Sequence, residues 1–396
     1  MGLDKRVKLL FLFLIVSLPL VAKPLVVEVN AKSAILMNAN TGKVLFEKNA
    51  TSCAFPASVT KMATALYLLE LEKDLEKMVV PSLEALRVEP LLKSASFHKI
   101  PYRLAPDGTM MGIKKGEELS IRSLLYGMLL ASGNDAANVL AESVGGSIPR
   151  FIEGLNRFLI ALGCKETHFC NPHGYHHPEH VTTAYDLALI TRYVINNEDL
   201  KKISTSLMFT CPKTNKSPAR DILQTNRLMK QGKYFYPYVL FSKTGYHSAS
   251  GSNLSVAAEK NGRRIIAILL GCDTYVQRYE DAITLLEAAF QEEVQERLIV
   301  SKQKLFARHL RGGATPLVAQ LSADLNYYYF DSEEEEAKAF VCWDELFLPI
   351  EKGARVGAIR LFGEGGRVLS EEPIYAVERV EKTLWKALKD FVSRFI

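Results

Sequence analysis

The sequence predicts a mixed α/β (α+β) protein, in which a mainly antiparallel sheet carries a helical subdomain, with a small all-β domain at the carboxyl end. A hairpin pattern near the amino end and strand patterns far along the chain predict the sheet, and helical periods fill the stretch between them. Near residue 300 the pattern changes to short apolar runs. With 396 residues, the chain exceeds the roughly 250 to 300 residues at which a single core stops growing, so two or three domains are expected.

The amino end predicts an export signal over residues 1–22. Lys5, Arg6 and Lys8 precede an apolar run, residues 9–21, that ends beside the small Ala22. An uncleaved membrane anchor is the alternative, because Leu20 fits the small-residue cleavage pattern poorly. Under either interpretation the body of the protein lies outside the cytoplasm.

Residues 23–298 are predicted to form the larger domain. A hairpin is expected from strands 33–37 and 43–46, and a buried helix over 56–70, because apolar residues lie on nearly every side of it. The remaining elements are expected as helices over 121–144, 148–162 and 183–196, strands over 253–258 and 264–270, and a last helix over 278–296.

Residues 299–376 are predicted to form the small, sandwich-like β domain. Its strands are expected within 317–319, 327–330, 339–343, 355–362 and 373–376, with 333–336 as a solvated acidic loop. Residues 377–396 are predicted to be one amphipathic helix, whose apolar stripe is Val377, Val380, Leu384, Leu388, Phe391 and Phe395. A basic excess on its other face suits an anionic membrane interface; the alternative is a helix docked on its own domain.

Composition excludes several classes of function. The formal net charge of +5 comes from 49 basic and 44 acidic residues, which is too small an excess for a nucleic-acid-binding protein. The six cysteines are scattered and form no zinc-type C-x-x-C spacing, and their pairing is left open.

Three short motifs carry the chemistry. Ser58-Val59-Thr60-Lys61 sets a hydroxyl and an amine three positions apart at a helix start, where a desolvated lysine can take the proton of a weak serine nucleophile. Ser132-Gly133-Asn134 follows an apolar stretch, and Lys243-Thr244-Gly245 is expected at the start of a strand. Each motif alone is explained equally well by a surface lysine, an interhelical turn or an edge strand. Together, in this order, they match the signature of penicillin-binding proteins and serine β-lactamases, with glycine replacing its middle aspartate.

The chain resembles the low-molecular-mass penicillin-binding proteins of the D-alanyl-D-alanine carboxypeptidase type, from about Ser33 to the carboxyl end. The matching words are Pro56 to Met62, Ser132 to Ala136, His173-Gly174 with Ala184 and Asp186, and Lys243 to Gly245. The resemblance implies a β-lactamase/transpeptidase-like catalytic domain.

The same resemblance implies a role for each motif residue. Ser58 would attack the carbonyl between two D-alanines, Lys61 would accept its proton, and Ser132 would relay a proton to the leaving amine. Asn134 would bind the substrate backbone, Lys243 and Thr244 would bind its terminal carboxylate, and Gly245 would leave room for it. The backbone N–H groups of Ser58 and Tyr246 would form the oxyanion hole. Tyr246 stands where family members often carry histidine, so the deacylation rate cannot be transferred.

No cofactor and no metal is expected. The loop that contains His173, His176, His177, Glu179 and His180 could suggest a metal site, but its spacing fits no helix and His173 belongs to the matched His-Gly pair. The partners implied are peptidoglycan stem peptides ending in D-Ala-D-Ala, β-lactams as covalent inhibitors, and the outer face of the cytoplasmic membrane, reached by the terminal helix of a periplasmic enzyme.

Three alternatives stay open. A β-lactamase would need a water-activating carboxylate, and no E-x-x-L-N stretch lies between the second and third motifs, since Glu166 and Asn171 are one residue too far apart. A D,D-endopeptidase would use the same site on cross-links. A non-catalytic wall-binding protein would keep the fold without the reaction.

Overall fold

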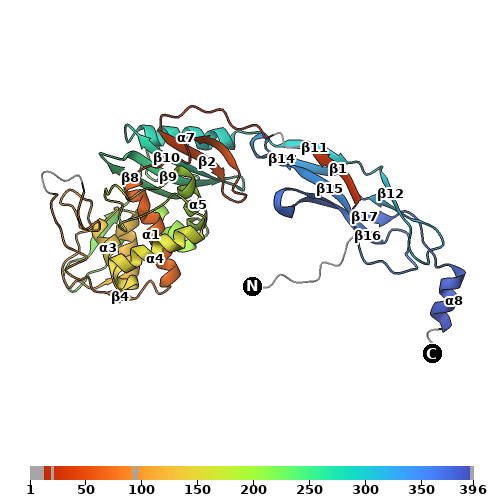
Figure 1. The fold of residues 1–396 in the computed structure, drawn as a ribbon, viewed down its shortest axis with the longest axis horizontal. Coiled ribbons are helices and arrows are strands. Elements are labelled where there is room, and N and C mark those ends of the chain that lie inside the picture. Colours follow the sequence, from red (N-terminus) through yellow and green to blue (C-terminus); the bar gives the residue numbers. More distant parts are fainter. Residues whose placement is uncertain (1–12, 19–21, 92–96, 393–396) are drawn as a thin grey trace. The chain divides into compact units, whose positions relative to one another are not determined.

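The computed structural model describes residues 13–18, 22–91 and 97–392. The chain divides into two compact units, which are described separately: Pro24–Gln291, and Glu292–Ile396 together with Met1–Lys23 (Figure 1).

The first unit is built on a five-stranded antiparallel sheet in the order β3-β2-β10-β9-β8. The strands are β2 (Ser33–Asn38), β3 (Val44–Lys48), β8 (Val239–His247), β9 (Gly251–Lys260) and β10 (Arg263–Cys272). Successive residues of β10 alternate between two cores, as side chains of a strand must: Ile265, Ala267 and Leu269 enter one, and Ile266, Ile268 and Leu270 the other. The sheet is therefore buried on both faces.

Helices cover the two faces unequally. One core is closed by α7 (Gln277–Phe290), whereas the other contains α1 (Thr60–Leu71), α5 (Ala184–Val194) and the rest of a helical subdomain (Figure 1). That subdomain adds α2 (Ile121–Leu129), α3 (Asn134–Gly145), α4 (Ile148–Ala161) and α6 (Glu198–Thr205), with two small ribbons, β4 (Met78–Val79) with β5 (Leu119–Ser120) and β6 (Met208–Cys211) with β7 (Arg220–Leu223). The predicted fold class is confirmed.

Two predicted helices are wrong in extent. The helix expected over 121–144 is two helices, because Ser132 adopts a left-handed backbone (φ 63°) and the Gly133 N–H donates to the Gly127 carbonyl. The last helix ends at Phe290, not 296, and Gln295 already begins a strand.

The second unit is mainly β. One sheet has the order β1-β15-β16-β17-β13-β12, and β11 pairs with β14. The strands are β1 (Phe13–Leu18), β11 (Gln295–Val300), β12 (Leu305–Arg308), β13 (Leu317–Leu321), β14 (Leu325–Tyr329), β15 (Ala337–Trp343), β16 (Arg355–Phe362) and β17 (Val368–Ala376). β1 comes from the predicted export signal, whose residues 1–12 and 19–21 lie outside the described part of the chain.

The acidic run in this unit is not solvated as expected. Glu334 and Glu335 are buried, and they pair with Arg297 (2.6 Å) and Arg367 respectively. Two arginines that are distant in the sequence therefore compensate the cost of burying these carboxylates, a contact that local composition does not predict.

The terminal helix is shorter than predicted. α8 spans Leu384–Val392, whereas Val380, expected on its apolar stripe, is 1% exposed and bridges to Ile350 in the β core. Within the described residues, no helix is long and apolar enough to cross a membrane.

All six cysteines are free.

Candidate active site

Ser58 lies in a short 3₁₀ turn, Ala57–Val59, that leads directly into α1. The turn is held from two sides. The Asn253 side chain donates to the Phe55 (2.8 Å) and Pro56 (3.1 Å) carbonyls, and Gly174 lies so close that a Cβ on it would be 1.9 Å from the Ala57 carbonyl oxygen. Ser58, the nucleophile predicted from the sequence, is half-buried. Its backbone is held in place by these neighbouring residues.

Lys61, one turn along α1, is fully buried beneath Ser58. Its Nζ is 2.8 Å from Ser58 Oγ, 2.7 Å from Asn134 Oδ1 and 2.7 Å from the His173 carbonyl oxygen. Burial, and next the charge of Lys243, hold the pKa of Lys61 well below its usual range. The amine is thus suited to be neutral beside the serine hydroxyl.

A second lysine stands beside this group. Lys243 Nζ donates to Ser132 Oγ (3.0 Å) and to the Thr244 carbonyl (3.0 Å). Ser132 and Asn134 flank the break between α2 and α3, so this loop links the two lysines. Burial, and then Arg278, lower the pKa of Lys243 to about 7.

Thr244, Gly245 and Tyr246 follow on β8, the edge strand of the sheet order. A Cβ on Gly245 would be 2.8 Å from the Pro56 carbonyl oxygen and 3.1 Å from the Ser58 nitrogen, so only glycine lets this strand approach the nucleophile so closely. The Tyr246 side chain is 66% exposed. The structure thus brings all eight predicted site residues to one place on the first unit.

Two residues of the site were not among the sequence candidates. Asp135 is buried and accepts N–H groups from Met111, Gly112, Ile113 and Ala136, and its charge opposes the lowering of the Lys61 pKa. Arg278, in the first turn of α7, donates to the Gly245 carbonyl (3.1 Å). Asp135 directly follows the second motif, and this position could have indicated it as a site residue. Arg278 belongs to no motif, so no sequence signal indicates it.

The histidine-rich loop is mainly structural. His180 is buried, accepts the Cys170 N–H on Nδ1 and contacts Thr60 Oγ1 through Nε2 (2.9 Å). Cys170, His177 and Glu179 have potential ligand atoms within 4.8 Å of one another. Burial raises the pKa of Cys170 to about 12, and His177 Nδ1 accepts the Glu179 N–H, so neither favours a metal. The absence of a metal stays a prediction.

Comparison with known proteins identifies the family. Residues 20–274 match the D-alanyl-D-alanine carboxypeptidase family, Peptidase_S11. The chain belongs to this family of serine peptidases. It is 30% identical over 356 residues to the D-alanyl-D-alanine carboxypeptidase DacF of Bacillus subtilis, covering 89% of this chain and 86% of that protein.

Solved structures show the same fold over nearly the whole chain. The D-alanyl-D-alanine carboxypeptidase DacD of Francisella tularensis superposes with a TM-score of 0.60 at 22% identity, covering 92% of this chain and 97% of that one. Penicillin-binding protein 5 of Haemophilus influenzae gives a TM-score of 0.60 at 24% identity, covering 90% and 99%. Both solved structures therefore share the fold of this chain over at least 90% of its length.

Proposed function

We propose that this serine D-alanyl-D-alanine carboxypeptidase removes the terminal D-alanine of peptidoglycan stem peptides through an acyl-enzyme on Ser58. The contacts of Lys61 support this most directly. A neutral amine has two N–H groups and one lone pair. The Asn134 and His173 oxygens are acceptors only and take both N–H groups, so the lone pair is directed at the Ser58 hydroxyl, which can donate.

Acylation then needs no outside base. Lys61 takes the proton of Ser58 Oγ as that oxygen attacks the carbonyl between the two D-alanines. The N–H groups of Ser58 and Tyr246 stabilise the oxyanion, and Ser132 passes a proton to the departing D-alanine amine. Water afterwards releases the shortened peptide from Ser58.

Substrate binding is assigned to the second lysine and its strand. Lys243 and Thr244 bind the terminal carboxylate, because a cation and a hydroxyl beside the nucleophile suit a substrate that ends in a free carboxylate. A bound carboxylate would raise the pKa of Lys243 and favour its charged form. Asn134 hydrogen-bonds the substrate backbone, and Gly245 lets β8 lie close to Ser58.

The test is release of D-alanine from a pentapeptide stem. The wild type is expected to release it and Ser58→Ala to release none, whereas Ser52→Ala, an exposed serine in the preceding turn, should behave as wild type. Release by Ser58→Ala would overturn the assignment, and cleavage of cross-linked dimers in preference to pentapeptide would favour the endopeptidase. Hydrolysis of a penicilloyl adduct on the millisecond scale would instead favour a β-lactamase.

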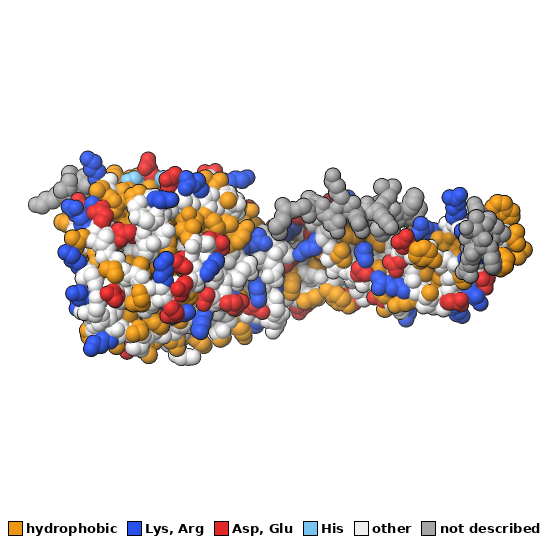
Figure 2. Space-filling model, turned by 90° about the horizontal axis from the view of Figure 1, so that it is seen from below, with side chains coloured by type: hydrophobic (Ala, Val, Ile, Leu, Met, Phe, Trp, Pro, Cys, Tyr) orange, Lys and Arg blue, Asp and Glu red, His pale blue; other side chains and the backbone are white. Residues whose placement is uncertain are grey.

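We propose, further, that the protein is exported by its first 22 residues and rests on the outer face of the cytoplasmic membrane through α8. Four large apolar side chains of this helix are exposed: Leu384 (91%), Trp385 (78%), Leu388 (68%) and Phe391 (61%). They form an apolar group at the α8 end of the second unit (Figure 2). Such a helix can bury these side chains at a lipid interface. Loss of vesicle binding in Leu388→Ser is the expected result.

A further inference from the structure

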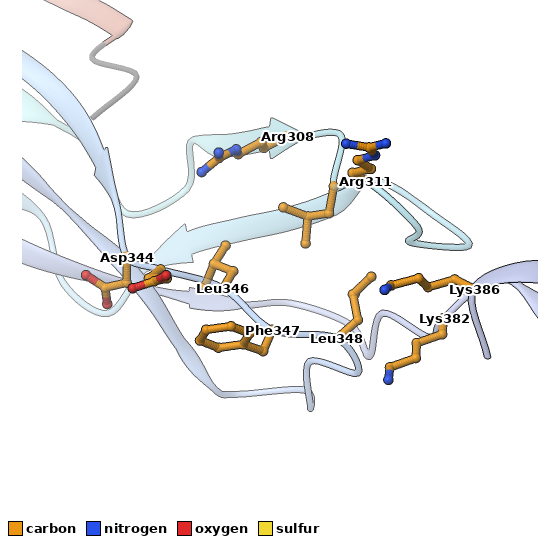
Figure 3. Close-up of a pocket in the computed structure, with 10 residues that line it drawn as sticks. Arg308, Arg311, Asp344, Leu346, Phe347, Leu348, Lys382 and Lys386 are labelled. Carbon is orange, nitrogen blue, oxygen red and sulfur yellow. The ribbon is translucent and has the colours of Figure 1, made fainter. Parts of the chain in front are cut away.

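A cavity of about 460 Å³ lies in the second unit, beside the start of α8. It is bordered by the β12–β13 turn, the segment after β15 and the residues that lead into α8, and it is open to solvent (Figure 3). Nothing in the reaction of the first unit uses it.

The cavity has a polarised lining. Arg311, Lys382 and Lys386 lie at one end, and Asp344 lies at the other (Figure 3). Arg308 and Glu345 complete the charged set, so basic residues outnumber acidic ones by four to two. Asp344 is in addition 3.6 Å from Arg355, a residue that does not line the cavity. The lining therefore favours an anion at the Arg311 end.

Between these ends the lining is apolar, with Leu310, Leu346, Phe347 and Leu348. Phe347 is 76% exposed, so its ring is open to solvent beside the cavity. A ligand that presents an anionic group and an apolar portion together would match this lining.

The position of the cavity is fixed relative to α8. The Thr383 N–H donates to the Gly312 carbonyl, and the Ala314 N–H donates to the Glu381 carbonyl. The segment 381–383, which leads into α8, is therefore held on the β12–β13 turn. Thr383 Oγ1 then accepts the Lys386 N–H and caps the helix, while the stem of Lys386 packs on Gly312. The cavity and the exposed apolar side chains of α8 are therefore held in a fixed position relative to each other.

We propose that this cavity binds the headgroup of an anionic phospholipid. The phosphate lies between Arg311, Lys382 and Lys386, the headgroup hydroxyls donate to Asp344 and Glu345, and the start of the acyl chains contacts Phe347 and Leu348. The proposal rests on the membrane contact of α8 proposed above, and it adds a recognition site for lipid charge. Helix α8 supplies apolar affinity, and the cavity selects anionic lipid.

The experiment measures binding of the whole protein to phosphatidylglycerol/phosphatidylcholine vesicles and to phosphatidylcholine vesicles alone. Arg311→Gln/Lys382→Gln should bind the anionic vesicles about 30-fold more weakly, since each basic residue near such a surface contributes about 1 kcal/mol. Binding to phosphatidylcholine should not change. The control Lys302→Gln/Lys304→Gln loses the same charge in exposed positions at the opposite end of β12, and it should bind close to wild type. Equal losses in both variants would overturn the proposal, because they would show attraction by overall charge alone.

A soluble short-chain phosphatidylglycerol, kept monomeric, separates the cavity from the helix. Leu388→Ser should lose vesicle binding yet keep this lipid, whereas Arg311→Gln/Lys382→Gln should lose the lipid. A wild type that binds no vesicle but still binds the short-chain lipid would refute the role of α8 and leave the cavity assignment standing. Competition by inorganic phosphate as strong as by the lipid would refute lipid recognition. Unchanged labelling of Ser58 by penicillin shows that the first unit of each variant is folded, and an unchanged thermal unfolding transition of the second unit shows the same for the part that carries the substitutions.

Discussion

Replacing Lys243 with methionine should make the protein more stable while removing its activity. Lys243 is 3% exposed, and burial with the nearby Arg278 lowers its pKa from 10.5 to about 7. At about 1.4 kcal/mol per pKa unit, the buried charge destabilises the folded state by roughly 5 kcal/mol below pH 7. The variant also loses two hydrogen bonds, to Ser132 and Thr244, of about 1 kcal/mol each, and leaves their acceptors buried.

With about 1 kcal/mol more for the acceptors left without a donor, the expected net gain is about 2 kcal/mol, or roughly 4 to 8 °C in Tm for a unit of this size. The pH dependence has a definite sign. Between pH 7 and about 10.5 the unfolded chain holds a proton on Lys243 that the folded chain lacks, so wild-type stability rises with pH in this window. The advantage of Lys243→Met is therefore largest at pH 7 and below and shrinks toward pH 10.

Calorimetry at several pH values is the assay, with the exposed Lys115→Met as the matched control. The control should show neither the gain nor its pH dependence. A variant that is less stable than wild type at every pH, or a stability gain that grows with pH, would contradict this prediction.

Two more predictions follow from the packing around Ser58. In Gly245→Ala the new Cβ, 2.8 Å from the Pro56 carbonyl oxygen, should push strand and turn apart by a few tenths of an ångström and slow acylation by penicillin at least about 10-fold in stopped-flow; wild-type rates would contradict the close approach. In wild type, kcat/KM should fall as pH decreases through the pKa of Lys61, because protonated Lys61 cannot accept the Ser58 proton. Asp135→Asn removes a charge that raises this pKa, so its acid limb should lie at lower pH, and a limb at higher pH would be inconsistent with the electrostatics.

The sequence predicted elements well where a local period decides them. The strand pattern at 355–362 corresponds to β16, and the turn after Asn38 does join β2 to β3. The sequence-based prediction was wrong where contacts with residues distant in the sequence determine the local structure. The period through 121–144 continues past Ser132, but the loop there is fixed by Asp135, which accepts backbone N–H groups from residues 111–113. Val380 keeps a helical spacing with Leu384 yet packs into a β core.

The site was predictable to a similar degree. The order of the three motifs was enough to predict Ser58, Lys61 and Lys243 as site residues. Each lies in a motif whose residue types the chemistry requires. Arg278 could not be predicted as a site residue, because its contact with Gly245 depends on the first turn of α7 lying beside β8 in the folded unit. The burial that lowers both lysine pKa values is likewise a property of the packed helices and sheet, and no single motif contains it.

Peptide mass spectrometry after a short exposure to penicillin tests whether neutral Lys61 activates Ser58. We expect one adduct per molecule on the peptide that contains Ser58, and we expect it to form at least about 100-fold more slowly in Lys61→Met, because a general base is lost. An adduct on another residue, or acylation of Lys61→Met at the wild-type rate, would contradict this expectation.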